Sequence, residues 1–124
     1  MLSKSLFLLA IISSAVFAEV YNPPITFPKK GDVFKAGETI TVLWDTTDLP
    51  PNIPNKGMIL LGRLTADSEN LDVKHPLAKG FWLTEGSYNI TFPAKAKTAH
   101  NYILALLGDS GNISKTFTIC GKSK

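Results

Sequence analysis

Residues 37–46, GETITVLWDT, decide the fold that the sequence predicts. Ile40, Val42 and Trp44 alternate with residues that are mostly polar, and a glycine opens the run. This alternation, rich in β-branched residues, is typical of a strand with one buried face. An indole is large enough to fill the space between two sheets that lie about 10 Å apart. We therefore expect Trp44 to lie at the centre of a small β-sandwich core.

Six more segments have strand-like patterns and are separated by turn-forming residues. They are residues 20–27, 58–64, 77–84, 87–92, 100–107 and 113–120. Prolines confine the first of them to a sheet edge. The run at 58–64 is apolar throughout, which favours a strand buried on both faces. Glu85 and Gly86 predict a tight turn that joins the third and fourth segments into a hairpin.

These patterns predict an all-β fold. About seven short strands, no convincing helix and no internal repeat fit a two-sheet antiparallel sandwich of the immunoglobulin or fibronectin type III kind. Val33 and Phe34 follow a turn and are expected to cap one end of the core. A small open barrel is the alternative architecture.

The N-terminus has the features of a secretory signal peptide. Lys4 gives a basic start, residues 5–17 are apolar apart from serines, and Ala18 provides a small residue at the cleavage position. The apolar run is shorter than the roughly 20 residues of a transmembrane helix. We expect a signal peptide at residues 1–18, a single domain at residues 19–124, and no membrane segment after cleavage.

Charge and cysteine content narrow the partners and the chemistry. The chain has a formal net charge of +3, but its lysines are scattered and form no basic stripe, so we expect no nucleic-acid partner. Cys120 is the single cysteine, which excludes an intramolecular disulfide. It is either a half-buried thiol at the end of the last strand or half of an intermolecular disulfide.

Three side chains are candidate sites outside the core. In the segment KGFWLT, Phe81 and Leu83 share a face, so Trp82 points the other way and can stack on a sugar ring. The alternative is that Trp82 packs beneath the proline-rich loop or a neighbouring side chain. Asn89 and Asn112 begin N-glycosylation sequons, NIT and NIS, the second in a predicted loop.

The sequence offers little for catalysis or metal binding. His75 and His100 are far apart and lack carboxylates or cysteines at ligand spacing, so we expect no metal site and no cofactor. Ser110 has no strand-turn-helix elbow and no evident histidine partner. We expect a protein that is not an enzyme; a glycan-acting enzyme is the third hypothesis.

Three segments carry a family resemblance: residues 25–38 (ITFPKKGDVFKAGE), residues 40–46 (ITVLWDT) and residues 106–119 (LLGDSGNISKTFTI). Together they resemble the N-terminal immunoglobulin-like domain of the fungal Kre9/Knh1 family of cell-wall proteins. The resemblance implies a secreted, non-enzymatic module associated with the cell wall and, in the yeast members, with β-1,6-glucan assembly. Family members often continue into a Ser/Thr-rich stalk and a GPI signal, and this chain has neither before Lys124. We therefore expect a freely secreted, stand-alone domain.

Two functions follow as hypotheses. The first is a secreted fungal binding or structural module, extracellular or at the cell wall, whose partner is a wall polysaccharide such as glucan. The second is a secreted interaction module, an effector or inhibitor, that binds another extracellular protein. It would use the proline-rich loop and the GDSGN loop, since loops of a sandwich commonly carry such contacts.

Overall fold

The computed structural model describes residues 23–54, 56–108 and 111–122. The predicted signal peptide lies outside these residues, as does Ser110. Within the described ranges the one helical element is the short 3-10 turn η1 (Leu83–Glu85). None of the helices found there is long and apolar enough to cross a membrane.

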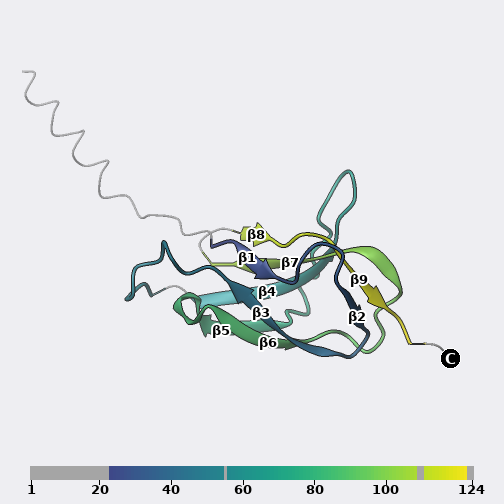
Figure 1. Cartoon of the computed structure of the whole chain (residues 1–124), viewed down its shortest axis with the longest axis horizontal. Coiled ribbons are helices and arrows are strands. Elements are labelled where there is room, and N and C mark those ends of the chain that lie inside the picture. The colour runs from purple at the N-terminus through teal and green to yellow at the C-terminus, as the bar shows by residue number, and fades with distance from the viewer. Residues whose placement is uncertain (1–22, 55, 109–110, 123–124) are drawn as a thin grey trace, which may run out of the picture.

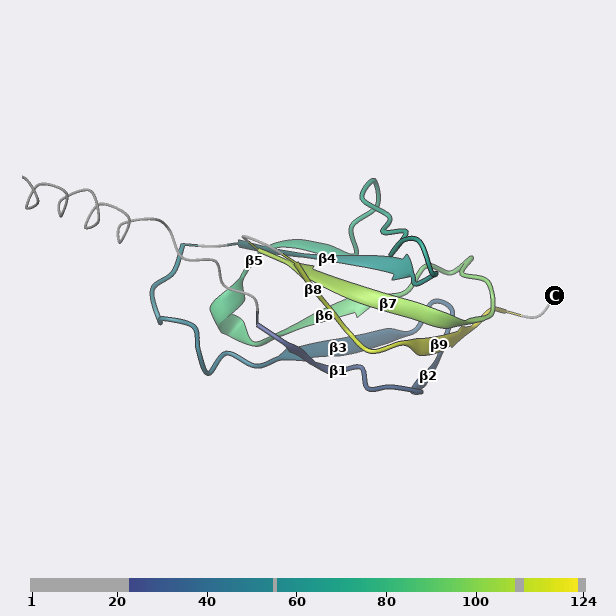
Figure 2. The same cartoon turned by 90° about the horizontal axis from the view of Figure 1, so that it is seen from above.

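The described chain folds into two facing sheets (Figures 1 and 2). The three-stranded sheet has the order β1 (Ile25–Phe27), β3 (Thr39–Trp44), β6 (Ser87–Thr91). The six-stranded sheet has the order β2 (Val33–Lys35), β9 (Phe117–Cys120), β7 (Ala99–Leu107), β4 (Lys56–Arg63), β5 (Ala78–Trp82), and β8 (Gly111–Ile113) also pairs with β7. The predicted all-β, immunoglobulin-like sandwich is confirmed.

The opening strand β3 has the predicted orientation. Ile40, Val42 and Trp44 are buried, and the alternate positions are exposed. The Trp44 side chain is 4% exposed, and its ring centroid lies 5.4 Å from that of Phe81 on the facing sheet. Trp44 therefore belongs to the core between the two sheets, as its position in the sequence predicts.

β4 and β7 are buried on both faces, as the apolar run at residues 58–64 predicts for β4. Ile59 belongs to the core between the sheets, so Leu60, which alternates with it, faces outward, yet it is only 1% exposed. The loop at residues 64–77 covers this outer face: the Asp72 amide donates to the Leu61 carbonyl at 2.9 Å. Figure 2 shows the loop on the side of the six-stranded sheet that faces away from β3.

The predicted hairpin at residues 77–92 is wrong. β5 pairs with β4 and β6 pairs with β3, so the chain crosses from one sheet to the other through η1. Leu83 explains this crossing, because its side chain is fully buried between the sheets and holds the segment that joins β5 to β6 against the core. Gly86, with φ of 75°, then turns the chain into β6.

Two further differences concern the ends of the domain. Val33 and Phe34 do not merely cap the core: they form β2, which pairs with β9 in parallel, so the sandwich is not wholly antiparallel. Phe34 points inward and contacts the ring of Phe117 at 5.6 Å between centroids. The predicted strand at residues 113–120 is divided into β8 and β9, because the Ser114 hydroxyl accepts the Leu104 amide at 3.0 Å.

Candidate functional site

Trp82 is the last residue of β5 and lies on the outer face of the six-stranded sheet. Its neighbours Phe81 and Leu83 are buried, whereas Trp82 is 45% exposed, which matches the orientation predicted from the alternation. Lys56 is its partner across the β4–β5 ladder, and the Lys56 ammonium lies 4.2 Å from the centroid of the indole. We call this pair the Trp82–Lys56 platform.

A β-bulge orients the platform. Gly57 pairs with Phe81 and Met58 pairs with Lys79, so Gly80 has no partner in the ladder. Its φ of 83° is one that glycine adopts without strain. Bulges re-aim the side chains that follow them, and here the residues after Gly80 place one ring inward and the indole outward.

The contacts around the platform are polar and adjustable. A cation–π contact at an exposed site contributes about 0.5–1 kcal/mol, so the flexible Lys56 side chain can move off the ring at small cost. Its ammonium then offers hydrogen-bond donors beside a flat apolar surface. Glu85 is held nearby, because its Oε2 accepts the Trp82 amide at 3.4 Å. This arrangement is suited to binding a ligand with an apolar face and hydroxyl groups.

A second exposed aromatic ring contacts Phe81, the residue before Trp82. Tyr88 of β6 is 38% exposed and stacks on Phe81, with ring centroids 4.7 Å apart. Tyr88 lies in the strand-like run at residues 87–92, and the sequence pattern did not predict its exposure because that exposure depends on β6 lying at a sheet edge. It missed Lys56 as well, since the contact with Trp82 depends on the register between β4 and β5.

The two predicted glycosylation sites have different surroundings. Asn89 is exposed on β6, and its Oδ1 accepts the Thr41 hydroxyl at 2.6 Å. Asn112 is half-buried, and its Nδ2 donates to the Pro23 carbonyl at 3.1 Å. The expected loop position of Asn112 is wrong, because the residue belongs to β8 and pairs with Leu106 of β7. Modification of either asparagine stays a prediction.

Cys120 ends β9 and is half-buried, with a free thiol in the described chain. Its backbone pairs with Lys35, and its carbonyl accepts the Ala36 amide at 2.9 Å. This is the position expected for a thiol that ends the last strand. An intermolecular disulfide stays a prediction.

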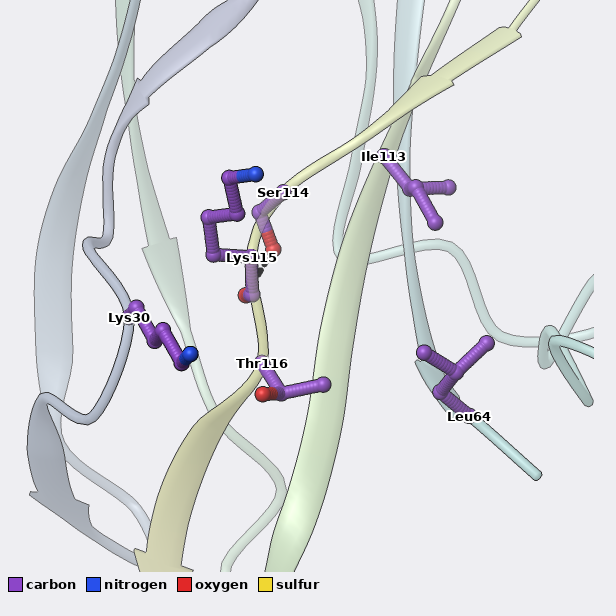
Figure 3. Close-up of a pocket in the computed structure, with 6 residues that line it drawn as sticks. All are labelled: Lys30, Leu64, Ile113, Ser114, Lys115 and Thr116. Carbon is purple, nitrogen blue, oxygen red and sulfur yellow. Dashed lines mark hydrogen bonds between the residues drawn. The ribbon is translucent and has the colours of Figure 1, made fainter.

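A shallow pocket of about 350 Å³ lies beside the link between β8 and β9 (Figure 3). Its lining consists of Lys30, Leu64, Ile113, Ser114, Lys115 and Thr116. The Ser114 hydroxyl is committed to the backbone, since it accepts the Leu104 amide and donates to the Lys115 carbonyl. The pocket can hold a small polar group, but it presents no general base to activate this serine.

Neither histidine lines this pocket. The Nδ1 atom of His75 lies 3.1 Å from an oxygen of Asp72 on the surface, and Nδ1 of His100 lies 2.9 Å from the Thr118 hydroxyl. Within the described ranges, no three histidine, cysteine, aspartate or glutamate side chains are grouped so that they could hold a metal ion. The lack of enzymatic activity stays a prediction.

Comparison with protein-family models gives a match that spans most of the chain. A family model described as the Kre9/KNH-like N-terminal Ig-like domain matches residues 27–119, from the end of β1 into β9. No curated protein matches the chain. The matched region is most of the sequence and contains the whole Trp82–Lys56 platform. The chain therefore belongs to the Kre9/KNH-like Ig-like domain family, which is associated with secreted cell-wall proteins.

Proposed function

We propose that the domain is a secreted, non-enzymatic module that binds a polysaccharide of the fungal cell wall, a glucan, outside the cell. The observation that carries the proposal is the Trp82–Lys56 platform. Its indole is exposed on the outer face of an edge strand, beside a flexible ammonium group. Family membership supports a cell-wall-related role, and the platform supplies a chemical means of contact.

The chemistry of the platform suits a sugar ring. The C–H face of a pyranose is apolar and flat, and it can lie on an indole while its hydroxyl groups accept hydrogen bonds from Lys56. Covering half of an indole buries about 100 Å² of apolar surface, which contributes about 2.5 kcal/mol at 25 cal/mol/Å². Displacing Lys56 from the ring costs about 0.5–1 kcal/mol of this gain.

The affinity of one site for one sugar is therefore expected to be low, weaker than about 1 mM for this contact alone. Low affinity is compatible with retention on an insoluble polymer, because the polymer presents many equivalent sites close together. The relevant measurement is thus retention on a solid polysaccharide and not binding of a monosaccharide in solution.

The experiment is co-sedimentation of the secreted protein with insoluble glucan and with chitin. We expect wild type to sediment with glucan, Trp82→Ala to lose most of this retention, and Trp82→Phe to keep part of it. Leu43→Ala is the matched control, because Leu43 is 42% exposed on the outer face of the other sheet. A Trp82→Ala protein that sediments like wild type contradicts the proposal.

The same experiment separates the alternatives. Wild-type protein that sediments with no wall polysaccharide would favour the second hypothesis, an extracellular protein partner bound through the loops. Release of reducing sugar from soluble glucan would favour the enzyme hypothesis, and we expect none.

A further inference from the structure

Besides the three-residue strand β8, which pairs only with β7, four strands have outer backbone groups without a partner strand: β1 and β6 in one sheet, β2 and β5 in the other. An open edge strand is a template for pairing with another chain. Proteins protect such edges with proline, charge, shortness or a bulge. The strand β8 is protected by its shortness, and the other four edges differ in whether they have such protection.

Three of the edges are protected by their sequence. β1 is three residues long, with Pro24 before it and Pro28 after it. β2 is also three residues long and ends in Lys35. β5 carries Lys79 and the bulge at Gly80. Each of these edges is therefore a poor template for strand addition.

β6 has none of these features. It is five residues long, SYNIT, without proline or charge. Its register with β3 is continuous from Thr39↔Thr91 to Leu43↔Ser87, with no bulge. In the described part of the chain, β6 is thus the edge most open to pairing with a second copy of the protein.

Asn89 lies at the centre of this edge, and its amide is oriented. Because Oδ1 accepts the Thr41 hydroxyl at 2.6 Å, the carbonyl end of the amide faces β3. The contact with Thr41 thus uses Oδ1 and not Nδ2, the atom to which an oligosaccharide is linked, and β6 has no neighbouring strand on its other side. Asn89 and Thr91, the two defining residues of this sequon, are both exposed.

The side chains of Asn112 and Ser114, in the second sequon, make hydrogen bonds to the backbone of other residues. Asn112 uses Nδ2 to bind the Pro23 carbonyl, which fixes the segment before β1. Ser114 is only 5% exposed, and its hydroxyl both accepts and donates hydrogen bonds within the backbone. An oligosaccharide on Nδ2 of Asn112 would crowd the contact with Pro23, so the folded protein is expected to carry this sequon unmodified.

We propose that Asn89 carries an N-linked oligosaccharide that shields the β6 edge from pairing with another copy of the chain. The donor is an oligosaccharide linked to a lipid pyrophosphate in the secretory pathway. A bond forms between Nδ2 and the anomeric carbon, the bond from that carbon to the pyrophosphate oxygen breaks, and the amide nitrogen loses one proton. Oδ1 remains an acceptor for Thr41. This proposal depends on secretion and not on sugar binding by Trp82.

The modification is tested by secreting the full chain from a eukaryotic host. Its intact mass is measured before and after treatment with peptide N-glycosidase, which leaves aspartate at the modified position. We expect one oligosaccharide, an aspartate at position 89, loss of the oligosaccharide in Asn89→Gln, and its retention in Asn112→Gln. An unmodified wild type, or an oligosaccharide on Asn112, overturns the assignment.

The shielding role is tested with variants that lack the oligosaccharide. Asn89→Gln and Thr91→Ala both remove the sequon, and Thr91→Ala keeps the contact between Asn89 and Thr41. We expect both to sediment as dimers or larger species at concentrations where the glycoprotein is a monomer. Asn89→Lys, which places a charge on the same edge, is expected to stay monomeric. Thermal melting confirms that each variant is folded. Monomeric Asn89→Gln and Thr91→Ala proteins overturn the shielding role.

Discussion

The indole of Trp44 has both an apolar and a polar function in the core. Its ring packs against Phe81, and its Nε1 donates to the carbonyl of Leu83 at 2.7 Å. Leu83 begins η1, so this hydrogen bond joins the opening strand to the segment that crosses between the sheets. Trp44 therefore stabilises a connection in addition to filling space.

We predict that Trp44→Ala lowers the free energy of unfolding by about 3–5 kcal/mol, because it removes a large buried side chain and leaves a cavity. Trp44→Phe keeps most of the apolar volume but leaves the Leu83 carbonyl without its donor, which costs about 1–3 kcal/mol. Urea denaturation followed by circular dichroism measures both. Wild-type stability in Trp44→Ala would show that the core is not centred on this residue.

Asp45, the next residue, predicts a pH effect. The Thr47 hydroxyl and the Thr47 amide both donate to its Oδ1, and these hydrogen bonds lower the pKa of Asp45 below its ordinary value. A carboxyl whose pKa is lower in the folded state adds stability above its unfolded pKa, and this stability is lost as pH falls through the folded pKa. The acid side of the stability profile therefore includes Asp45.

Replacing Thr47 by valine removes the hydroxyl and keeps the backbone donor. We expect the pKa of Asp45 to rise toward its ordinary value in Thr47→Val, and the stability that Asp45 contributes at neutral pH, and loses in acid, to become smaller. An NMR titration of the Asp45 carboxyl in both proteins measures the change. Identical titration curves would mean that the hydroxyl does not hold the carboxylate.

Single residues were predictable where burial alone decided their position. The alternation around Phe81 and Leu83 was sufficient to place Trp82 on the outer face. The Lys56 contact was not predictable, because it requires the β4–β5 register with its bulge at Gly80. The different surroundings of Asn89 and Asn112 also depend on partners, Thr41 and Pro23, that are distant in sequence.

At the scale of the elements, the path of the chain at residues 83–86 is what the sequence did not predict. Glu85 and Gly86 form a turn as predicted, but the same turn residues serve a hairpin or a crossing between sheets. Burial of Leu83 decides between them, and an apolar residue before a turn is compatible with both. β2 was missed for a related reason: it is three residues long, and its parallel partner β9 is at the other end of the domain.

Gly62 allows the loop at residues 64–77 to lie on the outer face of β4. A Cβ atom at this position would lie 2.4 Å from the Glu69 carbonyl oxygen and 2.7 Å from Leu71 Cδ2. The first of these neighbours is backbone, which cannot rotate away as a side chain can. A side chain at position 62 therefore has no room unless the backbone of the loop at residues 64–77 moves.

We predict that Gly62→Ala displaces this loop and destabilises the protein by about 1–3 kcal/mol, the usual cost of overpacking. Limited proteolysis should then cleave the loop faster, while Gly31→Ala, which has no atom within 4 Å of its Cβ position, serves as a control for backbone strain alone. A Gly62→Ala loop as resistant as that of wild type would contradict the packing described for the outer face.

At the scale of the whole molecule, stability depends on apolar burial. The chain has one cysteine, so no intramolecular disulfide constrains the unfolded state. The core between the sheets is supplemented by the outer cluster on β4 and β7, where Leu60, Ile103 and Ala105 are at most 1% exposed. Because both faces of these two strands are covered, they add apolar burial that the small three-stranded sheet does not provide.

We predict that a reducing agent leaves the melting temperature of the secreted protein unchanged, and that Cys120→Ser melts within a few degrees of wild type. Differential scanning calorimetry with and without reductant measures this, and non-reducing electrophoresis shows the covalent state. A dimer band that disappears on reduction would instead establish the intermolecular disulfide, and a lower melting temperature under reduction would show that it contributes to stability.

The parallel pairing of β2 with β9 has a consequence for the time course of folding. Val33 must meet Thr118, and Lys35 must meet Cys120, so the six-stranded sheet is incomplete until almost the entire domain has been synthesised. Pairings between residues so distant in sequence slow folding, and sandwiches of this kind typically fold in about milliseconds to seconds. Until β9 has been made, β2 has no partner strand and the core lacks Phe117 and Ile119, so the domain cannot complete its fold before its last strand is available.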